Sequence, residues 1–195
     1  MSRVSSRRKW LNFFKTCYEK SIPSFGNQPK MDVFDEQKHY AFHYGVPTNE
    51  LRRVASWTLT ECKGHEKRIA KCIPHLWKRK GREDCLLAGL FLANLPQEAL
   101  QENVWMAFIH LLQHVEPIEM VLEVSAEIKR GGHQLPEGPW FHAMAEQSQL
   151  WHQYAVLILS QKQPIPLDCH NLVKDAPPGG ELFERIRETM LHPKD

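Results

Sequence analysis

Residues His75–Leu95 read HLWKRKGREDCLLAGLFLANL, and this stretch contains a helix end, a break and the start of a second helix. Four basic residues surround Gly81 at the break: Lys78, Arg79, Lys80 and Arg82. The apolar run that follows predicts a helix over 83–94. It is shorter than the ~18 to 20 residues that a membrane-spanning helix needs, so we expect no membrane association.

Apolar helical segments of this kind recur along the chain at nearly constant spacing. They begin at Leu51, Leu86, Val121 and Tyr154, at intervals of 35, 35 and 33 residues. Such a period is typical of stacked helix pairs, in which each pair buries its apolar face against the next. The sequence therefore predicts an all-α protein with the architecture of a HEAT-like helical repeat solenoid, whose concave side suits a long ligand.

Apolar residues at i, i+3 and i+4 predict helices throughout the chain, whereas strand patterns are scarce. The expected helices cover 5–20, 31–43, 48–61, 65–79, 83–94, 97–114, 117–130, 139–146, 149–161 and 180–191. We interpret 1–195 as a single domain, with a basic helical cap at 1–38, repeats at 39–161, and a loop with one C-terminal helix at 162–195.

The N-terminal twenty residues are basic and allow two interpretations. An amphipathic first helix would have Trp10, Phe13 and Phe14 on its buried side. The same Arg- and Ser-rich composition also occurs in organelle transit peptides.

Charge is distributed unevenly along the chain. Residues 1–82 contain 18 Lys and Arg against 7 Asp and Glu, whereas residues 83–195 contain 7 against 16. This asymmetry favours a polyanionic partner for the first half, and the alternative is a merely solvated basic surface.

Motifs for metals and cofactors are absent from the sequence. The five cysteines include no C-x-x-C pair, and His110 and His114 lack the glutamate of a metalloprotease helix. No glycine-rich phosphate loop or nucleophile elbow occurs. We expect no metal and no cofactor, and free thiols in a reducing cytosol.

Three segments resemble one family, the AlkD-like DNA alkylation-repair glycosylases, over roughly residues 40 to 160. HYGVPTNELRRVA is similar to the family's aromatic-Gly-Val segment followed by Leu-Arg. LWKRKGREDCLLAGLFL resembles its pattern of Leu-Trp, Glu and Leu-Ala, matched here by Trp77, Glu83 and Ala88. SQLWHQYAVLIL looks like its late Leu-Trp segment, matched by Trp151.

The resemblance implies a HEAT-like fold that holds duplex DNA on a basic concave surface without reading its sequence. It also implies hydrolysis of the N-glycosidic bond of a cationic N-alkylpurine, aided by an Asp and facing tryptophans near the deoxyribose. The residues that we expect to contact DNA phosphates are Arg52, Arg53, Lys78, Arg79, Lys80 and Arg82. The corresponding expectation is a monomer in the cytoplasm, associated with the nucleoid.

The candidate catalytic residues are Glu119, Glu123, Trp151 and Tyr154. The family's catalytic Asp falls at Leu122, so Glu119 or Glu123 would have to replace it. Three hypotheses follow: a glycosylase with an altered active site, a non-catalytic DNA-binding relative, and a helical scaffold for an acidic protein surface. For the tryptophans, including Trp77, Trp105 and Trp151, packing in helix interfaces is the alternative to a site role.

Overall fold

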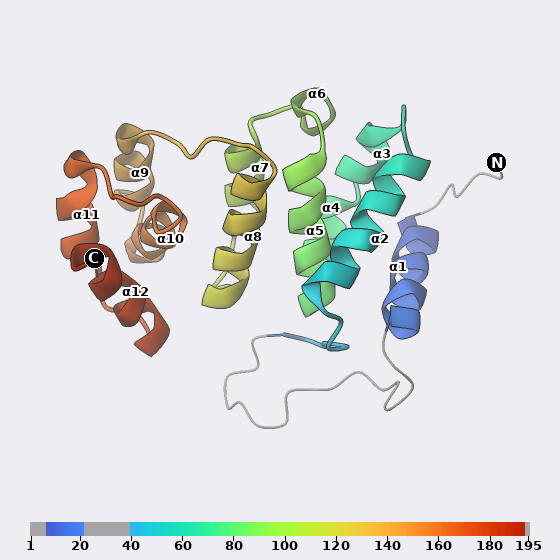
Figure 1. Cartoon of the computed structure of the whole chain (residues 1–195), viewed down its shortest axis with the longest axis horizontal. Helices are drawn as coiled ribbons and strands as arrows, with labels where there is room; N and C mark the ends of the chain where they lie inside the picture. The colour runs from blue at the N-terminus through green and yellow to red at the C-terminus, as the bar shows by residue number, and fades with distance from the viewer. Residues whose placement is uncertain (1–6, 22–39, 194–195) are drawn as a thin grey trace. The chain divides into compact units, whose positions relative to one another are not determined.

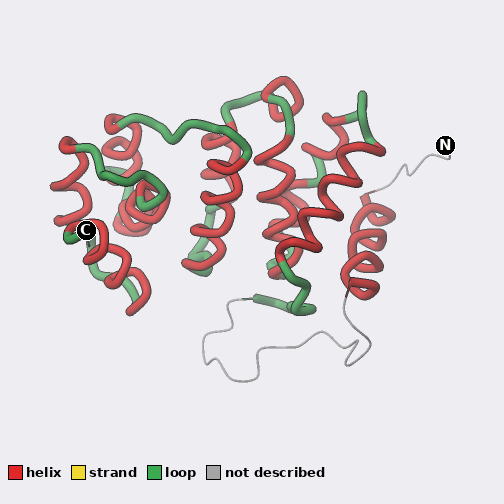
Figure 2. Tube along the Cα trace, viewed as in Figure 1, coloured by secondary structure: helices red, strands yellow, loops and turns green. Residues whose placement is uncertain are grey.

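The computed structural model describes residues 7–21 and 40–193, and the regular elements within these residues are helices (Figure 2). The predicted all-α class is thus confirmed. Contacts divide the chain into two compact units, Met1–Gln113 and His114–Asp195. Within the described ranges, no helix combines the length and the apolar character needed to cross a bilayer.

The first unit is built around one central helix (Figure 1). Its elements are α1 (Arg7–Ser21), α2 (Thr48–Glu61), α3 (Glu66–Ala70), α4 (Ile73–Trp77), α5 (Arg82–Asn94), α6 (Gln97–Leu100) and α7 (Val104–Leu111). Helix α5 contacts α2, α3, α4 and α7. Every residue of α5 from Glu83 to Ala93 is buried, which is expected of a helix covered on all sides.

Aromatic side chains fill the interfaces of this unit. Phe14 and Tyr18 of α1 are fully buried, and the Phe14 ring lies 5.7 Å from that of Phe91 in α5. Trp77 is also buried and meets Phe108 edge to face, with ring centroids 6.0 Å apart. Trp77 therefore has the packing role that the sequence left as the alternative.

The second unit has α10 (Gln149–Leu159) at its centre. Its other elements are α8 (Ile118–Arg130), α9 (Gly138–Ala145), a 3₁₀ turn (Leu167–Cys169), α11 (His170–Lys174) and α12 (Glu181–Leu191). Helix α10 contacts α8, α9, α11 and α12, and its residues from Tyr154 to Leu159 are buried.

The four positions that define the sequence period lie in helix interiors of the two units. Leu51 is in α2, Leu86 in α5, Val121 in α8 and Tyr154 in α10, and each is at most 2% exposed. The period therefore marks buried helix positions correctly.

Two of the expected helices are each broken into a pair. The helix expected over 65–79 is α3 and α4, because Pro74 lacks an N–H and its ring would collide with the carbonyl of Ala70, where α3 ends. The helix expected over 97–114 is α6 and α7, separated where Gln101 adopts a left-handed φ of 67°. Asn103 then begins α7, since its side chain accepts the Trp105 N–H at 2.8 Å.

Two further segments differ from the prediction. The helix expected over 31–43 falls mostly outside the described residues, and its last four residues, 40–43, are not helical. The Pro- and Gly-rich segment after Ser160 was expected to be a loop, yet it contains α11, whose Leu172 and Val173 are buried. A helix of five residues with two apolar side chains is too short to show a helical period, so hydrophobic periodicity could not predict it.

Candidate nucleic-acid interface

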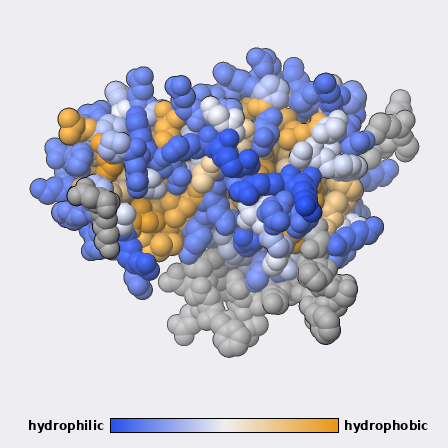
Figure 3. Space-filling model, in the orientation of Figure 1, coloured by the Kyte–Doolittle hydropathy of each residue, from blue (hydrophilic) through white to orange (hydrophobic). Residues whose placement is uncertain are grey.

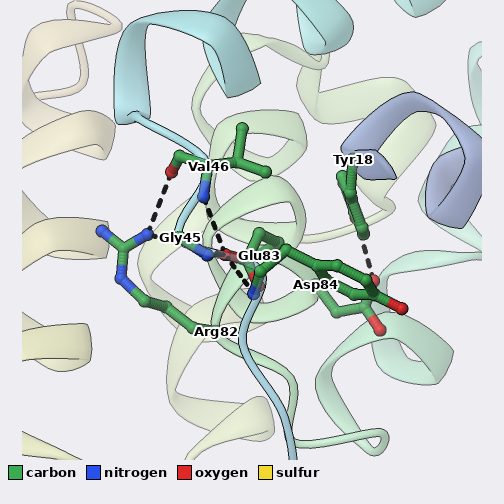
Figure 4. Close-up of polar contacts among 7 residues, drawn as sticks. Tyr18, Gly45, Val46, Arg82, Glu83 and Asp84 are labelled. Atoms are coloured by element: carbon green, nitrogen blue, oxygen red, sulfur yellow. Dashed lines mark hydrogen bonds and ion pairs between the residues drawn. The ribbon is translucent and has the colours of Figure 1, made fainter. Parts of the chain in front are cut away.

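Glu83, in the first turn of α5, fixes the segment that precedes α2. Its Oε1 accepts the backbone N–H groups of Tyr44, Gly45 and Val46 at 3.0, 3.0 and 3.2 Å (Figure 4). The side chain of Glu83 is completely buried. A buried carboxylate is costly unless it is hydrogen-bonded, and three N–H donors on one oxygen supply that compensation.

The backbone conformation of Gly45 allows this arrangement. Its φ of 74° lies in the left-handed region, which glycine adopts without strain from a Cβ. This turn brings three successive N–H groups to the same oxygen atom. This segment is the YGVP stretch, residues 44–47. Its glycine is required because the turn needs a left-handed backbone conformation.

The basic loop between α4 and α5 lies against the same segment. Ala41 donates its N–H to the carbonyl of Lys80 at 2.8 Å, and Arg82 donates its N–H to the carbonyl of Phe42 at 3.1 Å. Phe42 and Gly81 form an isolated parallel bridge. A Cβ on Gly81 would come within 2.2 Å of the Phe42 ring, so no larger residue fits at this point without a shift of the ring.

A second buried carboxylate, Asp84, joins three parts of the first unit. Its Oδ1 accepts the hydroxyl of Tyr18 at 2.9 Å, and its Oδ2 lies 3.0 Å from Nε of Arg79. The Arg79 guanidinium also lies over the ring of Phe42, 5.3 Å from its centroid. Burial raises the pKa of Asp84 to about 6, although the positive charge of Arg79 and the Tyr18 hydrogen bond act in the opposite direction.

The two carboxylates in the first turn of α5 each have one oxygen atom without a hydrogen bond in the described part of the chain. No hydrogen bond to Oδ2 of Asp84 meets the usual geometry within the described residues, despite the short distance from Arg79. Oε2 of Glu83 is likewise buried without a hydrogen-bond partner there. The first turn of α5 therefore carries two buried acids that are only partly compensated.

The six residues predicted to contact phosphates divide into two groups. Arg79 and Arg82 are mostly buried, Arg79 beside Asp84 and Arg82 with its guanidinium donating to the carbonyl of Val46 at 3.2 Å. Their charges are already used inside the unit. The other four are exposed: Arg52 and Arg53 in α2, and Lys78 and Lys80 in the loop.

The candidate catalytic residues all lie in the second unit. Glu119 is exposed in the first turn of α8, and Glu123 is partly buried one turn later. Trp151 is partly buried and meets Tyr154 edge to face, with centroids 5.7 Å apart. These four residues belong to the second unit, whereas the six residues predicted to contact phosphates belong to the first.

Tyr154 has a structural role within the second unit. Its hydroxyl donates to the carbonyl of His114 and accepts the N–H of Glu116, the latter at 2.8 Å. Burial raises its pKa to about 12. The hydroxyl thus donates one hydrogen bond and accepts another, and both stabilise the backbone at the start of this unit. Because it also remains protonated, it is poorly suited to proton transfer.

One exposed aromatic residue was not selected from the sequence. Trp57 in α2 is 51% exposed, and its ring lies 5.3 Å from that of Phe13 in α1. The available signal was its position four residues after Arg53, which places both on one side of a helix. The pair combines a cation with an open aromatic face.

Searches of protein-family models, curated proteins and solved structures find nothing that matches this chain. The residues of the two units are therefore the basis for a functional assignment.

Proposed function

We propose that this protein binds duplex DNA without reading its sequence, through the exposed basic surface of Met1–Gln113. The observation that carries the proposal is the sign of the exposed charges in the described part of this unit. Twelve exposed side chains are basic and two, Glu61 and Glu98, are acidic. The basic ones are Arg8, Lys9, Lys15, Lys20, Arg52, Arg53, Lys63, Lys67, Arg68, Lys71, Lys78 and Lys80.

Burial contributes to this imbalance. Glu83 and Asp84 are in the interior, so their negative charges are withdrawn from the surface. On the face drawn in Figure 3, strongly hydrophilic residues lie over α2, beside smaller apolar patches. Phosphate contacts from Lys and Arg supply affinity that does not depend on base sequence, which fits a surface of this composition.

The loop containing Lys78 and Lys80 is held in a defined position. Backbone hydrogen bonds attach it to residues 41 and 42, and Glu83 anchors the continuation of that segment up to α2. The ammonium groups at the loop and the guanidinium groups at the start of α2 are thus carried by connected, fixed backbone. Such preorganisation lowers the entropic cost of binding an extended polyanion.

The resemblance to AlkD-like alkylation-repair proteins supports DNA as the polyanion. Two of its three segments, YGVP and the stretch from Leu76 to Ala88, are in direct contact through Glu83. These two segments are therefore neighbours in the first unit. We accordingly propose a HEAT-like stacking of the helices, with DNA along the basic side.

Binding is tested by fluorescence anisotropy with a labelled duplex over a series of salt concentrations. Changing Lys78 and Lys80 together to Ala should weaken binding and lower the log–log salt slope by about 1.8, since each neutralised phosphate contributes about 0.9. Arg79 is left unchanged because its loss would leave Asp84 without its cation. Lys174→Ala with Arg185→Ala, two exposed residues of the other unit, is the matched control.

An unchanged slope in the loop variant, or equal effects of loop and control variants, would contradict the proposal. Base excision is a separate question, asked with a duplex that carries 7-methylguanine and is treated with alkali after incubation. Strand cleavage that disappears with Glu119→Gln or Glu123→Gln would add glycosylase activity. Salt-dependent binding without cleavage would define a non-catalytic DNA-binding protein.

A further inference from the structure

Trp57 presents an aromatic face to solvent while its position is fixed from one side. The ring is 51% exposed, and Phe13 of α1 packs against it at 5.3 Å with an interplanar angle of 31°. Phe13 is itself held by Trp10 and Phe14, whose centroids lie 6.1 and 5.4 Å from its own. An exposed indole supported in this way loses little conformational entropy when a flat ligand stacks on it.

A cation lies one helical turn from this ring. Arg53 precedes Trp57 by four residues on α2, so the two side chains share one face of the helix. The Arg53 side chain is 78% exposed and pairs with Glu50 at 3.0 Å. Exposed pairs of this kind contribute little free energy, so a phosphate can replace Glu50 as the partner of Arg53.

We infer that Trp57 and Arg53 form a subsite for an unpaired nucleotide, with the base stacked on the indole and its phosphate bound by the guanidinium. The inference rests on the proposed DNA-binding function. Aromatic stacking with an adjacent cation is the usual way in which proteins bind single-stranded nucleic acid irrespective of sequence. Most exposed charges in the described part of this unit are basic, although Glu61 lies one turn after Trp57, and this balance is complementary to a polyanion.

The subsite selects unpaired bases for a geometric reason. Within a duplex the faces of each base are covered by its neighbours, and only the edges and the backbone are accessible. A base becomes available for stacking when it is bulged, extruded or single-stranded. We therefore expect the protein to bind DNA with an unpaired base more tightly than the same DNA fully paired.

The experiment compares three labelled DNAs by anisotropy: a paired duplex, the same duplex with a one-nucleotide bulge, and a single strand. The proteins are wild type, Trp57→Leu, which keeps apolar contact with Phe13 but has no ring, and Trp57→Phe, which keeps a smaller ring. Trp140→Leu is the control, because Trp140 is a partly exposed tryptophan of the other unit that packs on Phe141. Circular dichroism establishes that each variant is folded.

Wild type should prefer the bulged duplex, and Trp57→Leu should reduce this preference about tenfold, equivalent to about 1.4 kcal/mol of stacking. Binding of the paired duplex should change little, Trp57→Phe should be intermediate, and Trp140→Leu should behave as wild type. The inference is overturned if wild type has no preference, or if folded Trp57→Leu retains it; the exposed indole would then suit a protein partner instead. Failure of wild type to bind the paired duplex would refute the proposed function, whereas single-strand binding dependent on Trp57 would still uphold the subsite.

Discussion

The hydroxyl of Tyr18 in α1 donates a 2.9 Å hydrogen bond to Oδ1 of Asp84 in α5, 66 residues away along the chain. Both side chains are completely buried. Desolvation raises the pKa of Tyr18 well above its ordinary value, and the negative charge of Asp84 adds to this effect. The tyrosine thus remains a hydrogen-bond donor at all physiological pH values and links the first helix to the centre of its unit.

Tyr18→Phe should destabilise the first unit by about 1 to 3 kcal/mol. The substitution removes the donor but leaves the buried carboxylate of Asp84, whose Oδ1 then has no hydroxyl to accept from. Urea denaturation gives the loss of stability, and hydrogen exchange should show the largest gain in α1. Protection of α1 equal to that in wild type would mean that the aromatic contacts alone fix this helix.

Asp84→Asn should change how stability depends on pH. Because the folded-state pKa of Asp84 is raised to about 6, the folded protein binds a proton more tightly than the unfolded chain, whose Asp titrates near 3.9. Stability from this group is greatest below about pH 4 and is lost as the pH rises through about 6. The variant has no carboxyl at this position, so this pH dependence disappears.

The measurement is the free energy of unfolding of both proteins at about pH 4.5 and about pH 7. Wild type should lose about 2 kcal/mol relative to Asp84→Asn over this interval. Equal changes in the two proteins would show that Arg79 compensates Asp84 fully.

Glu83→Ala should be more damaging than Glu83→Gln. Alanine leaves three N–H groups at residues 44–46 without an acceptor, at a cost of about 3 to 5 kcal/mol. Glutamine retains one carbonyl oxygen, so it should lose less than half of that amount. Thermal denaturation of wild type and the two variants measures the order of stability. Equal losses of stability in the two variants would show that the hydrogen bonds to residues 44–46 are not why Glu83 stabilises the fold.

Tyr154→Phe should lower the stability of the second unit by about 1 to 3 kcal/mol, because two hydrogen bonds to the backbone at residues 114 and 116 are lost. DNA binding by the first unit should be unchanged. Denaturation and anisotropy on the same preparation test both statements. A large loss of base excision in a variant of normal stability would restore the catalytic role predicted for this residue.

The sequence predicted helices well where the apolar period was long. Helix α2 begins and ends as predicted, and α5, α8 and α10 agree within two residues at each end. Prediction failed where a local feature overrode the period, as at Pro74, or where a helix was too short to have one, as at α11.

The candidate site was predicted only in part. Two of the predicted phosphate-binding residues, Arg79 and Arg82, contact Phe42 and Val46, which are distant in sequence. The burial of Glu83 and Asp84 depends on such tertiary contacts, and charged residues in a first helical turn usually face solvent. Their positions could not be inferred from local patterns.

The long separations between Glu83, Asp84 and their partners also bear on how the chain folds during synthesis. Tyr18 and residues 44–46 leave the ribosome before the carboxylates that will bind them, and each contact closes a loop of more than 35 residues. Until α5 emerges, the aromatic face of α1 has no partner in that helix. The nascent first unit consequently passes through a stage with apolar surface exposed, during which binding by a chaperone would protect it from aggregation.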